Sequence, residues 1–141
     1  MYKADFEQIS TLISVINNNI EIIESQKITS VKMLKREIIK YYAISMAIFT
    51  IQNKLIELGE ELVYSLEKNI YPKTYNDIAK ILLNQKIITH TQFKTFKSFI
   101  EYRNEIAHEY DDITENEIFW CLKNLDFVKD IIKISKEKLL K

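Results

Sequence analysis

Glycine and proline are almost absent from this sequence, which contains only Gly59 and Pro72 among its 141 residues. Tight β-hairpins depend on glycine-containing turns such as Asn-Gly and Asp-Gly. Their scarcity therefore excludes a sheet with many hairpins and favours long helices joined by short loops. We expect Pro72 to lie in a loop over residues 68–77. We expect Gly59 to bend or weaken a helix, because glycine inside a helix costs about 1 kcal/mol relative to alanine.

Cysteine is nearly absent as well, since Cys121 is the only one. An internal disulfide is therefore excluded, and no Cys-X-X-Cys pair exists for zinc. This pattern fits the reducing cytoplasm, and we interpret Cys121 as a small core residue on a helix. No apolar stretch approaches the roughly 20 residues of a membrane span, and the start "MYKADFEQIS" lacks the apolar run of a signal peptide. We predict a cytoplasmic protein without a membrane partner.

Net charge is also missing, because 20 Lys and Arg residues balance 20 Asp and Glu residues. A chain with equal numbers of positive and negative side chains has no general electrostatic attraction to nucleic acid or to anionic membranes. Any contact with nucleic acid must therefore come from a local group of positively charged residues. Hydrophobic residues make up 47% of the chain, which is enough for one well-buried core. We therefore predict a single domain over residues 1–141.

Apolar residues recur at helical spacing along most of the chain. Steps of three and four residues predict a first helix from Asp5 to about Gln26 and a much longer helix over residues 31–67. The middle of the long helix, residues 38–56, is apolar on more than one side, so we expect it at the centre of the bundle. A short helix is predicted from about Tyr75 to Asn84.

Two capping boxes mark the starts of the last two predicted helices. In this pattern a Ser or Thr and a Glu or Gln three residues later bond each other's backbone N–H groups. The pattern occurs at residues 89–92 and 114–117. One helix therefore begins near His90 and ends between Glu109 and Ile113, and the other runs from about Glu115 to Leu139. These segments predict an all-α, up-and-down bundle of four long helices plus a short helix.

The stretch "FIEYRNEIAHEYDD", residues 99–112, gathers polar residues on the helix that begins near His90. Arg103 falls on the apolar seam of this helix, together with Phe93, Phe96, Ile100 and Ala107. A guanidinium that faces a core needs a partner, an interface, or a cleft that admits an anion. His108 lies about 140° around an ideal helix from Arg103. Either the helix loosens before the "DDI" turn at residues 111–113 and His108 swings round, or the two side chains converge across a symmetric contact between two chains.

The same residues have a plainer interpretation. A histidine in the last turn of a helix is stabilised by the helix dipole, and an arginine often extends to solvent. One histidine with one arginine is a weak catalytic signal. His90 has no charged partner at helical spacing, so we interpret it as a solvated residue at a helix start. No second histidine lies three or four residues from His108, which argues against a metal site.

The order Arg103, four residues, His108, one residue and Tyr110 resembles the RX4HXY motif of the HepT-like toxins in the HEPN superfamily. Asn104, directly after the arginine, belongs to the same resemblance. The resemblance covers residues 75–125 well, and these residues follow that family's order of short helix, turn, motif helix, motif, turn and last helix. The two earlier predicted helices match the family in length and amphipathic character.

The resemblance implies a HEPN-like helical domain that forms a homodimer, with the motifs of two protomers in one cleft. It implies a metal-independent endoribonuclease without a cofactor, which acts on RNA as the toxin of a toxin–antitoxin pair. Arg103 and His108 would be the catalytic pair, with Asn104 as a supporting polar residue. The implied partner is a minimal nucleotidyltransferase antitoxin, which neutralises the toxin by transferring AMP to Tyr110.

These residue types suit RNA cleavage without a metal. The reaction needs a base for the 2′-hydroxyl proton, an acid for the leaving oxygen and a cation on the phosphate. His108 can serve as base or acid near neutral pH, and Arg103 can bind two phosphate oxygens. One histidine cannot serve as base and acid at the same time, whereas a dimer provides two copies of His108, one for each role. The alternative is a non-catalytic helical binding subunit of a nucleotidyltransferase complex.

Overall fold

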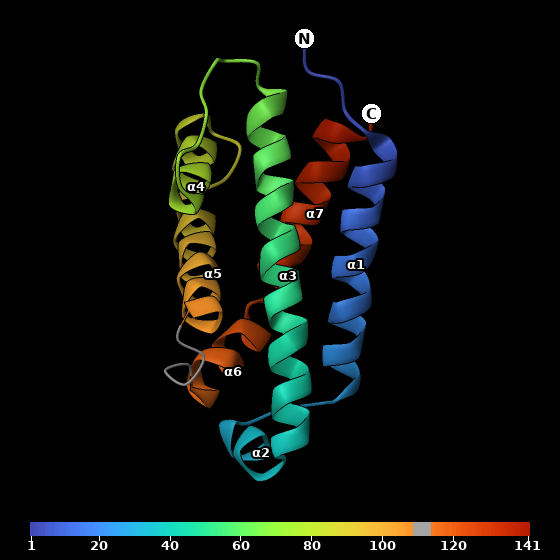
Figure 1. The fold of residues 1–141 in the computed structure, drawn as a ribbon, viewed down its shortest axis with the longest axis vertical. Helices are drawn as coiled ribbons and strands as arrows, with labels where there is room; N and C mark the ends of the chain where they lie inside the picture. Colours follow the sequence, from blue (N-terminus) through green and yellow to red (C-terminus); the bar gives the residue numbers. More distant parts are fainter. Residues whose placement is uncertain (109–113) are drawn as a thin grey trace.

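The computed structural model describes residues 1–108 and 114–141, and these residues form α-helices and no strand (Figure 1). The helices are α1 (Phe6–Ser25), α2 (Val31–Arg36), α3 (Ile38–Ser65), α4 (Tyr75–Asn84), α5 (His90–His108), α6 (Glu115–Lys123) and α7 (Leu125–Leu139). In Figure 1, α1 and α7 lie on one side of α3 and α4 and α5 on the other, while α2 and α6 lie toward one end. The predicted all-α class is confirmed.

Helix α3 is the centre of the bundle, because it packs against all of the other helices. Its inward residues are fully buried and include Ile44, Ile48, Ile51, Leu55 and Leu58. The expected central position is therefore confirmed for most of residues 38–56. The first turns of α3 differ from this expectation, since several large apolar side chains there are exposed.

Gly59 does not interrupt α3, which continues to Ser65. The residue is buried against α4 and α5. A Cβ atom at this position would lie 2.8 Å from Ile78 Cγ2 and 3.2 Å from Phe96 Cζ. The glycine therefore permits the close approach of α3, α4 and α5, and the expected break or weakening of the helix at this residue is not seen.

Two helices that the sequence predicts as continuous are each divided. Residues 31–67 form α2 and α3, which are separated at Glu37 with φ −116° and ψ 79°. Leu34 of α2 is buried and α2 packs on α6, so contacts with a distant part of the chain accompany this break. The last helix divides at Asn124, whose Nδ2 donates to the Trp120 carbonyl oxygen at 2.8 Å. This side chain takes the carbonyl that a continuous helix would offer to the backbone N–H of residue 124.

The starts of α5 and α6 agree with the predicted capping residues. The Thr89 N–H donates to Gln92 Oε1 at 2.9 Å, and the Gln92 N–H donates to Thr89 Oγ1 at 3.1 Å. The Thr114 N–H donates to Glu117 Oε2 at 3.1 Å. Pro72 lies in the loop before α4, as predicted. No helix within the described ranges combines the length and hydropathy of a membrane span.

Candidate active site

Arg103 lies in the last two turns of α5, on the side that faces α3 and α4. Its side chain is half-buried. The Nε–H donates to Asn53 Oδ1 of α3 at 2.8 Å, and Nη1 donates to Asn104 Oδ1 at 3.3 Å. Both acceptors are neutral amides. They orient the guanidinium without cancelling its positive charge.

Two aromatic rings from different helices complete the surroundings of Arg103. Its Cζ lies 5.7 Å from the centre of the Phe49 ring on α3 and 5.1 Å from the centre of the Tyr75 ring on α4. A guanidinium at these distances is attracted to the electron-rich face of the ring. Helices α3, α4 and α5 therefore hold one cation between them.

No carboxylate of residues 1–108 or 114–141 forms an ion pair with Arg103. The ion pairs in these residues are instead Glu37–Lys40, Lys54–Glu57 and Glu24–Lys129. The sequence left three explanations for an arginine on the apolar seam: a charged partner, an interface or an anion. Within the part of the chain that the structure describes, two neutral acceptors and two rings surround Arg103, and they leave it a positive charge that an anion can neutralise.

His108 is the last residue of α5 and is exposed. Helix α5 is regular from Arg103 through His108, and the "DDI" turn before which loosening was expected lies outside the described residues. The two side chains are therefore separated by about 140° around one helix. Ala107 is also exposed, so the predicted apolar seam stops before it. Tyr110 lies outside the described residues, and its predicted role stays a prediction.

A comparison with models of known protein families matches residues 16–136 to the family described as ribonuclease HepT-like. This span includes all of α5 and the predicted RX4HXY motif. The chain belongs to this family. A comparison with curated proteins found no match.

Three solved structures share the fold of this HepT-like chain. The cytosolic protein of unknown function YutE from Bacillus subtilis has a TM-score of 0.81 at 19% identity, with 97% of this chain and 92% of that one covered. A tri-AMPylated Shewanella oneidensis HEPN toxin in complex with MNT antitoxin has a TM-score of 0.79 at 16% identity, with 92% of this chain and 96% of that one covered. A toxin–antitoxin with AMP-PNP has a TM-score of 0.77 at 16% identity, with 91% of this chain and 97% of that one covered. At these identities the likeness concerns the fold alone.

Sequence reasoning identified Arg103 and Asn104 of the HepT-like motif but missed three residues around them. Asn53, Phe49 and Tyr75 belong to helices that lie far from the motif in the sequence. Asn53 had a detectable signal, because it is a polar amide within a mainly apolar helix. Nothing in the sequence paired it with Arg103, since their approach depends on how α3 packs against α5.

The remaining candidate residues agree with their plainer interpretations. Cys121 is fully buried and accepts a hydrogen bond from Gln52 Nε2 at 3.9 Å. Burial raises the pKa of the Cys121 thiol, which opposes its use as a nucleophile. His90 is exposed, with its ring centre 6.0 Å from that of Phe93. Within the described ranges, no group of three His, Cys, Asp or Glu residues is arranged to hold a metal ion.

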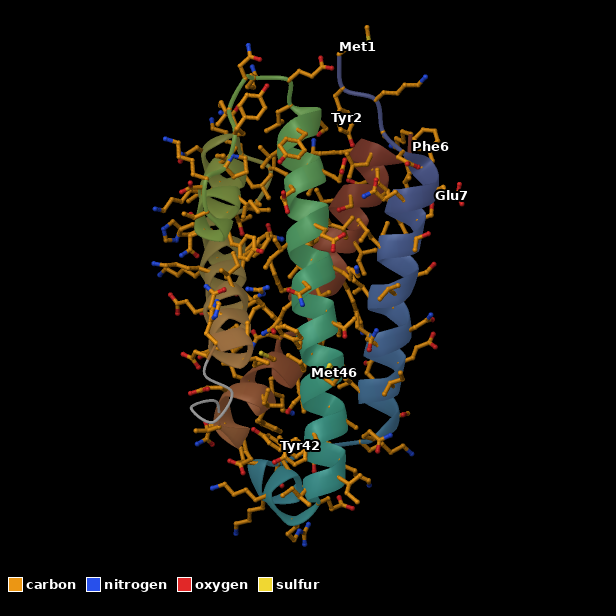
Figure 2. All side chains as sticks on the ribbon, in the orientation of Figure 1. Met1, Tyr2, Phe6, Glu7, Tyr42 and Met46 are labelled. Atoms are coloured by element: carbon orange, nitrogen blue, oxygen red, sulfur yellow. The ribbon has the colours of Figure 1, made fainter. Side chains whose placement is uncertain are left out.

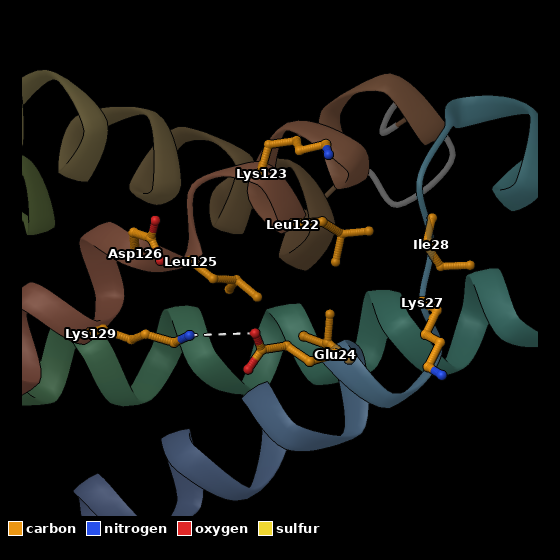
Figure 3. A pocket seen from close by; sticks show the side chains of 9 residues that line it. Glu24, Lys27, Ile28, Leu122, Lys123, Leu125, Asp126 and Lys129 are labelled. Atoms are coloured by element: carbon orange, nitrogen blue, oxygen red, sulfur yellow. Dashed lines mark hydrogen bonds and ion pairs between the residues drawn. The ribbon is translucent and has the colours of Figure 1, made fainter.

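Away from Arg103, the HepT-like chain has a cavity of about 290 Å³ between the end of α1 and the α6–α7 junction (Figure 3). Lysines and carboxylates both line it, and Lys129 Nζ lies 3.4 Å from Glu24 Oε2. The amino groups of Lys27 and Lys123 point away from the cavity in Figure 3. Its charges are therefore paired or divergent, unlike the charge of Arg103.

Proposed function

We propose that this chain is the toxin of a HEPN/MNT toxin–antitoxin pair and acts in the cytoplasm as a metal-independent endoribonuclease. Membership of the ribonuclease HepT-like family supports the activity. The observation that carries the proposal is Arg103, a half-buried guanidinium held by neutral acceptors. Such a group binds a phosphate oxygen pair well, because its donors are already oriented and its charge is not neutralised.

In the proposed reaction, Arg103 binds the phosphate that is to be cleaved and stabilises the negative charge that develops on it. His108 of one protomer takes the proton of the ribose 2′-hydroxyl, and the 2′-oxygen forms a new bond to phosphorus. The bond from phosphorus to the 5′-oxygen breaks, and the second protomer's His108 donates a proton to that oxygen. The products are a 2′,3′-cyclic phosphate and a 5′-hydroxyl end. Asn104 supports this step through its contact with Nη1 of Arg103.

One face of α3 supports the homodimer that this mechanism requires. Ile39, Tyr42 and Met46 are 83%, 53% and 64% exposed. Figure 2 labels the last two one above the other along α3. Steps of three and four residues continue this face to Phe49 and Asn53, which both contact Arg103. A second copy that covers this exposed apolar face would therefore lie beside the arginine site. Closed two-fold dimers are the commonest oligomers of soluble proteins.

The proposed antitoxin is a minimal nucleotidyltransferase that transfers AMP to Tyr110. Two proteins of the same fold are described in complex with an antitoxin, and one of these is an AMPylated HEPN toxin. Transfer from ATP would join the α-phosphorus to the tyrosine oxygen and release pyrophosphate. The new phosphodiester would compete with RNA for Arg103, and the attached nucleoside would occupy the cleft. Inhibition then requires no change of fold.

Catalytic variants test the nuclease. Arg103→Ala should lower the rate of RNA cleavage by about 10²–10³-fold, the range for loss of one donor that stabilises developing charge. His108→Ala should lower it by about 10²–10⁴-fold, the range for loss of an acid–base group. The helical circular dichroism of both variants should stay that of the parent. Arg36→Ala and His90→Ala are the matched controls at exposed positions. Cleavage should continue in EDTA. Cleavage that survives in His108→Ala, or that stops when divalent metal is removed, would overturn the mechanism.

Co-expression with a partner nucleotidyltransferase tests neutralisation and separates the toxin from a non-catalytic binding subunit. Intact-mass measurement should show one or more AMP additions, and peptide sequencing should map an addition to Tyr110. Tyr110→Phe should remain toxic yet escape modification. A parent chain that does not slow growth when expressed alone, and behaves like His108→Ala, would instead favour the non-catalytic subunit.

A further inference from the structure

A cavity of about 310 Å³ lies where the start of α4 meets α5, directly beside Arg103. We propose that it binds the nucleoside attached to the phosphate that Arg103 holds, a proposal that rests on the proposed ribonuclease function. The lining residues are Lys73, Thr74, Tyr75, Asn76, Ile100 and Asn104. Ligand pockets in proteins begin at about this size, roughly 300 Å³.

Two residues that line the cavity also contact Arg103. The Tyr75 ring centre lies 5.1 Å from Cζ of Arg103, and Asn104 Oδ1 accepts from Nη1 at 3.3 Å. In RNA a nucleoside is joined directly to each side of a phosphate. A phosphate on the guanidinium therefore brings one of its nucleosides to the mouth of this cavity.

Charge also distinguishes this cavity. Among the described residues, Lys73 is the only charged one that lines it. Each of the other four cavities described in residues 1–108 and 114–141 has at least one carboxylate in its lining, such as Glu24, Glu67, Glu57 and Glu137. RNA carries a negative charge at every phosphate. Of these five cavities, the one beside Arg103 offers a cation without a repelling carboxylate in its described lining.

The lining matches the chemistry by which proteins bind single-stranded RNA. Aromatic side chains provide a surface for stacking, and amides pair with the polar edges of bases. Tyr75 is 40% exposed, Ile100 forms a buried apolar wall, and Asn76 and Asn104 provide amides. Asn76 Oδ1 has no hydrogen-bond partner among the described residues, so turning this amide toward a nucleoside breaks no bond at that oxygen.

The backbone of this wall is already ordered before any ligand binds. Asp77 Oδ2 accepts from the N–H of Lys73 at 3.0 Å and from the N–H of Thr74 at 3.1 Å. Thr74 and Asp77 together form a capping box at the start of α4. These bonds lower the pKa of Asp77 and keep its carboxylate engaged with the backbone. A preformed wall reduces the ordering that binding would otherwise require.

The first test measures binding without cleavage. The ¹⁵N-labelled chain is titrated with each of the four ribonucleoside monophosphates at millimolar concentration, and with inorganic phosphate at matched ionic strength. The nucleotides should shift the Asn76 side-chain amide and the backbone amides of residues 73–76, whereas inorganic phosphate should leave the Asn76 amide unchanged. The absence of these shifts with every nucleotide, or equal shifts with phosphate, would overturn the proposal. Because no turnover is measured, this result is independent of the ribonuclease activity.

The second test measures recognition during cleavage. Asn76→Ala should lower kcat/KM by about 3- to 10-fold, the value of one hydrogen bond to a neutral group, with the loss mainly in KM and unequal among RNAs of different sequence. Asn84→Ala, at the exposed far end of α4, is the matched control and should equal the parent. An Asn76→Ala chain that equals the parent on every RNA would overturn the proposal. A parent that cleaves no RNA would instead overturn the proposed function, and the binding test would still decide the cavity.

Discussion

The Nε–H of Arg103 donates to the side-chain oxygen of Asn53 at 2.8 Å, which ties the end of α5 to the middle of α3. The two residues are 50 positions apart in the sequence. An amide in this place directs the guanidinium and leaves its charge intact. A carboxylate would direct it equally well but would also neutralise it.

Asn53 variants test whether the neutral acceptor matters. Asn53→Ala should lower kcat/KM for RNA by about 3- to 10-fold, because Arg103 loses one hydrogen bond that orients it. Asn53→Asp should lower it further, since the new carboxylate pairs with Arg103 and competes with the RNA phosphate. The Arg103 Nε–H resonance should be protected from solvent exchange in the parent and in Asn53→Asp, and lose that protection in Asn53→Ala.

Asn17→Ala, at an exposed position on α1, is the control for these variants. An Asn53→Asp chain with the cleavage rate of the parent would show that the neutrality of the acceptor has no role. Unchanged exchange of the Arg103 Nε–H in Asn53→Ala would show that another group holds the guanidinium.

The exposed face of α3 predicts which surface joins two protomers. Met46→Glu places a charge in the middle of this face, where Met46 is 64% exposed. Light scattering should show a dimer for the parent and a monomer for Met46→Glu, with loss of RNA cleavage. Ile22→Glu is the control, because Ile22 is also an exposed apolar residue, 50% exposed, but lies on α1. A parent that is an active monomer would refute this prediction.

The close packing at Gly59 predicts a loss of stability in Gly59→Ala. The helix gains about 1 kcal/mol from alanine, but overpacking a buried site costs about 1–3 kcal/mol. The new Cβ would meet Ile78 Cγ2 at 2.8 Å, and Ile78 is buried and stiff. The free energy of unfolding in urea should therefore fall by up to about 2 kcal/mol, the upper end of the difference between these two effects.

A double-mutant cycle isolates this contact. In an Ile78→Ala background the contacting methyl group is gone, so Gly59→Ala should become neutral or stabilising. Equal effects of Gly59→Ala in both backgrounds would assign the loss to some other contact.

Burial of Cys121 predicts an unreactive thiol. Burial raises its pKa, so at a given pH less of it is thiolate in the folded chain than in the unfolded chain. Reaction with a chromogenic disulfide at mildly alkaline pH should be slow in buffer and fast in guanidinium chloride. Rapid labelling of the folded chain would mean that Cys121 is accessible and would reopen its assignment as a core residue.

Local interactions explain which parts of the fold were predictable from the sequence. Helices α1 and α4 have the predicted bounds, and the Thr89 capping box starts α5 as expected, because these features depend on residues within a few positions of each other. The division at Asn124 also depends on a local bond, from the Asn124 side chain to the Trp120 carbonyl oxygen. An asparagine side chain can adopt several conformations, and only one of them replaces the backbone donor in this way, so the division did not follow from the sequence. The division at Glu37 accompanies the packing of α2 on α6, which the sequence does not display.

The sequence by itself determined the helical class and the family motif, since spacing and residue type are local properties of the chain. It also proposed Arg103, Asn104 and His108 as candidate site residues. Only the tertiary structure decided what surrounds Arg103. Its acceptor on α3 and its two aromatic contacts come from residues 49, 53 and 75, far from the motif. Their approach is set by the packing of α3, α4 and α5, where Gly59 permits the helices to come close. No local pattern encodes which distant side chain will fill a given contact, because that depends on the shape of the whole core.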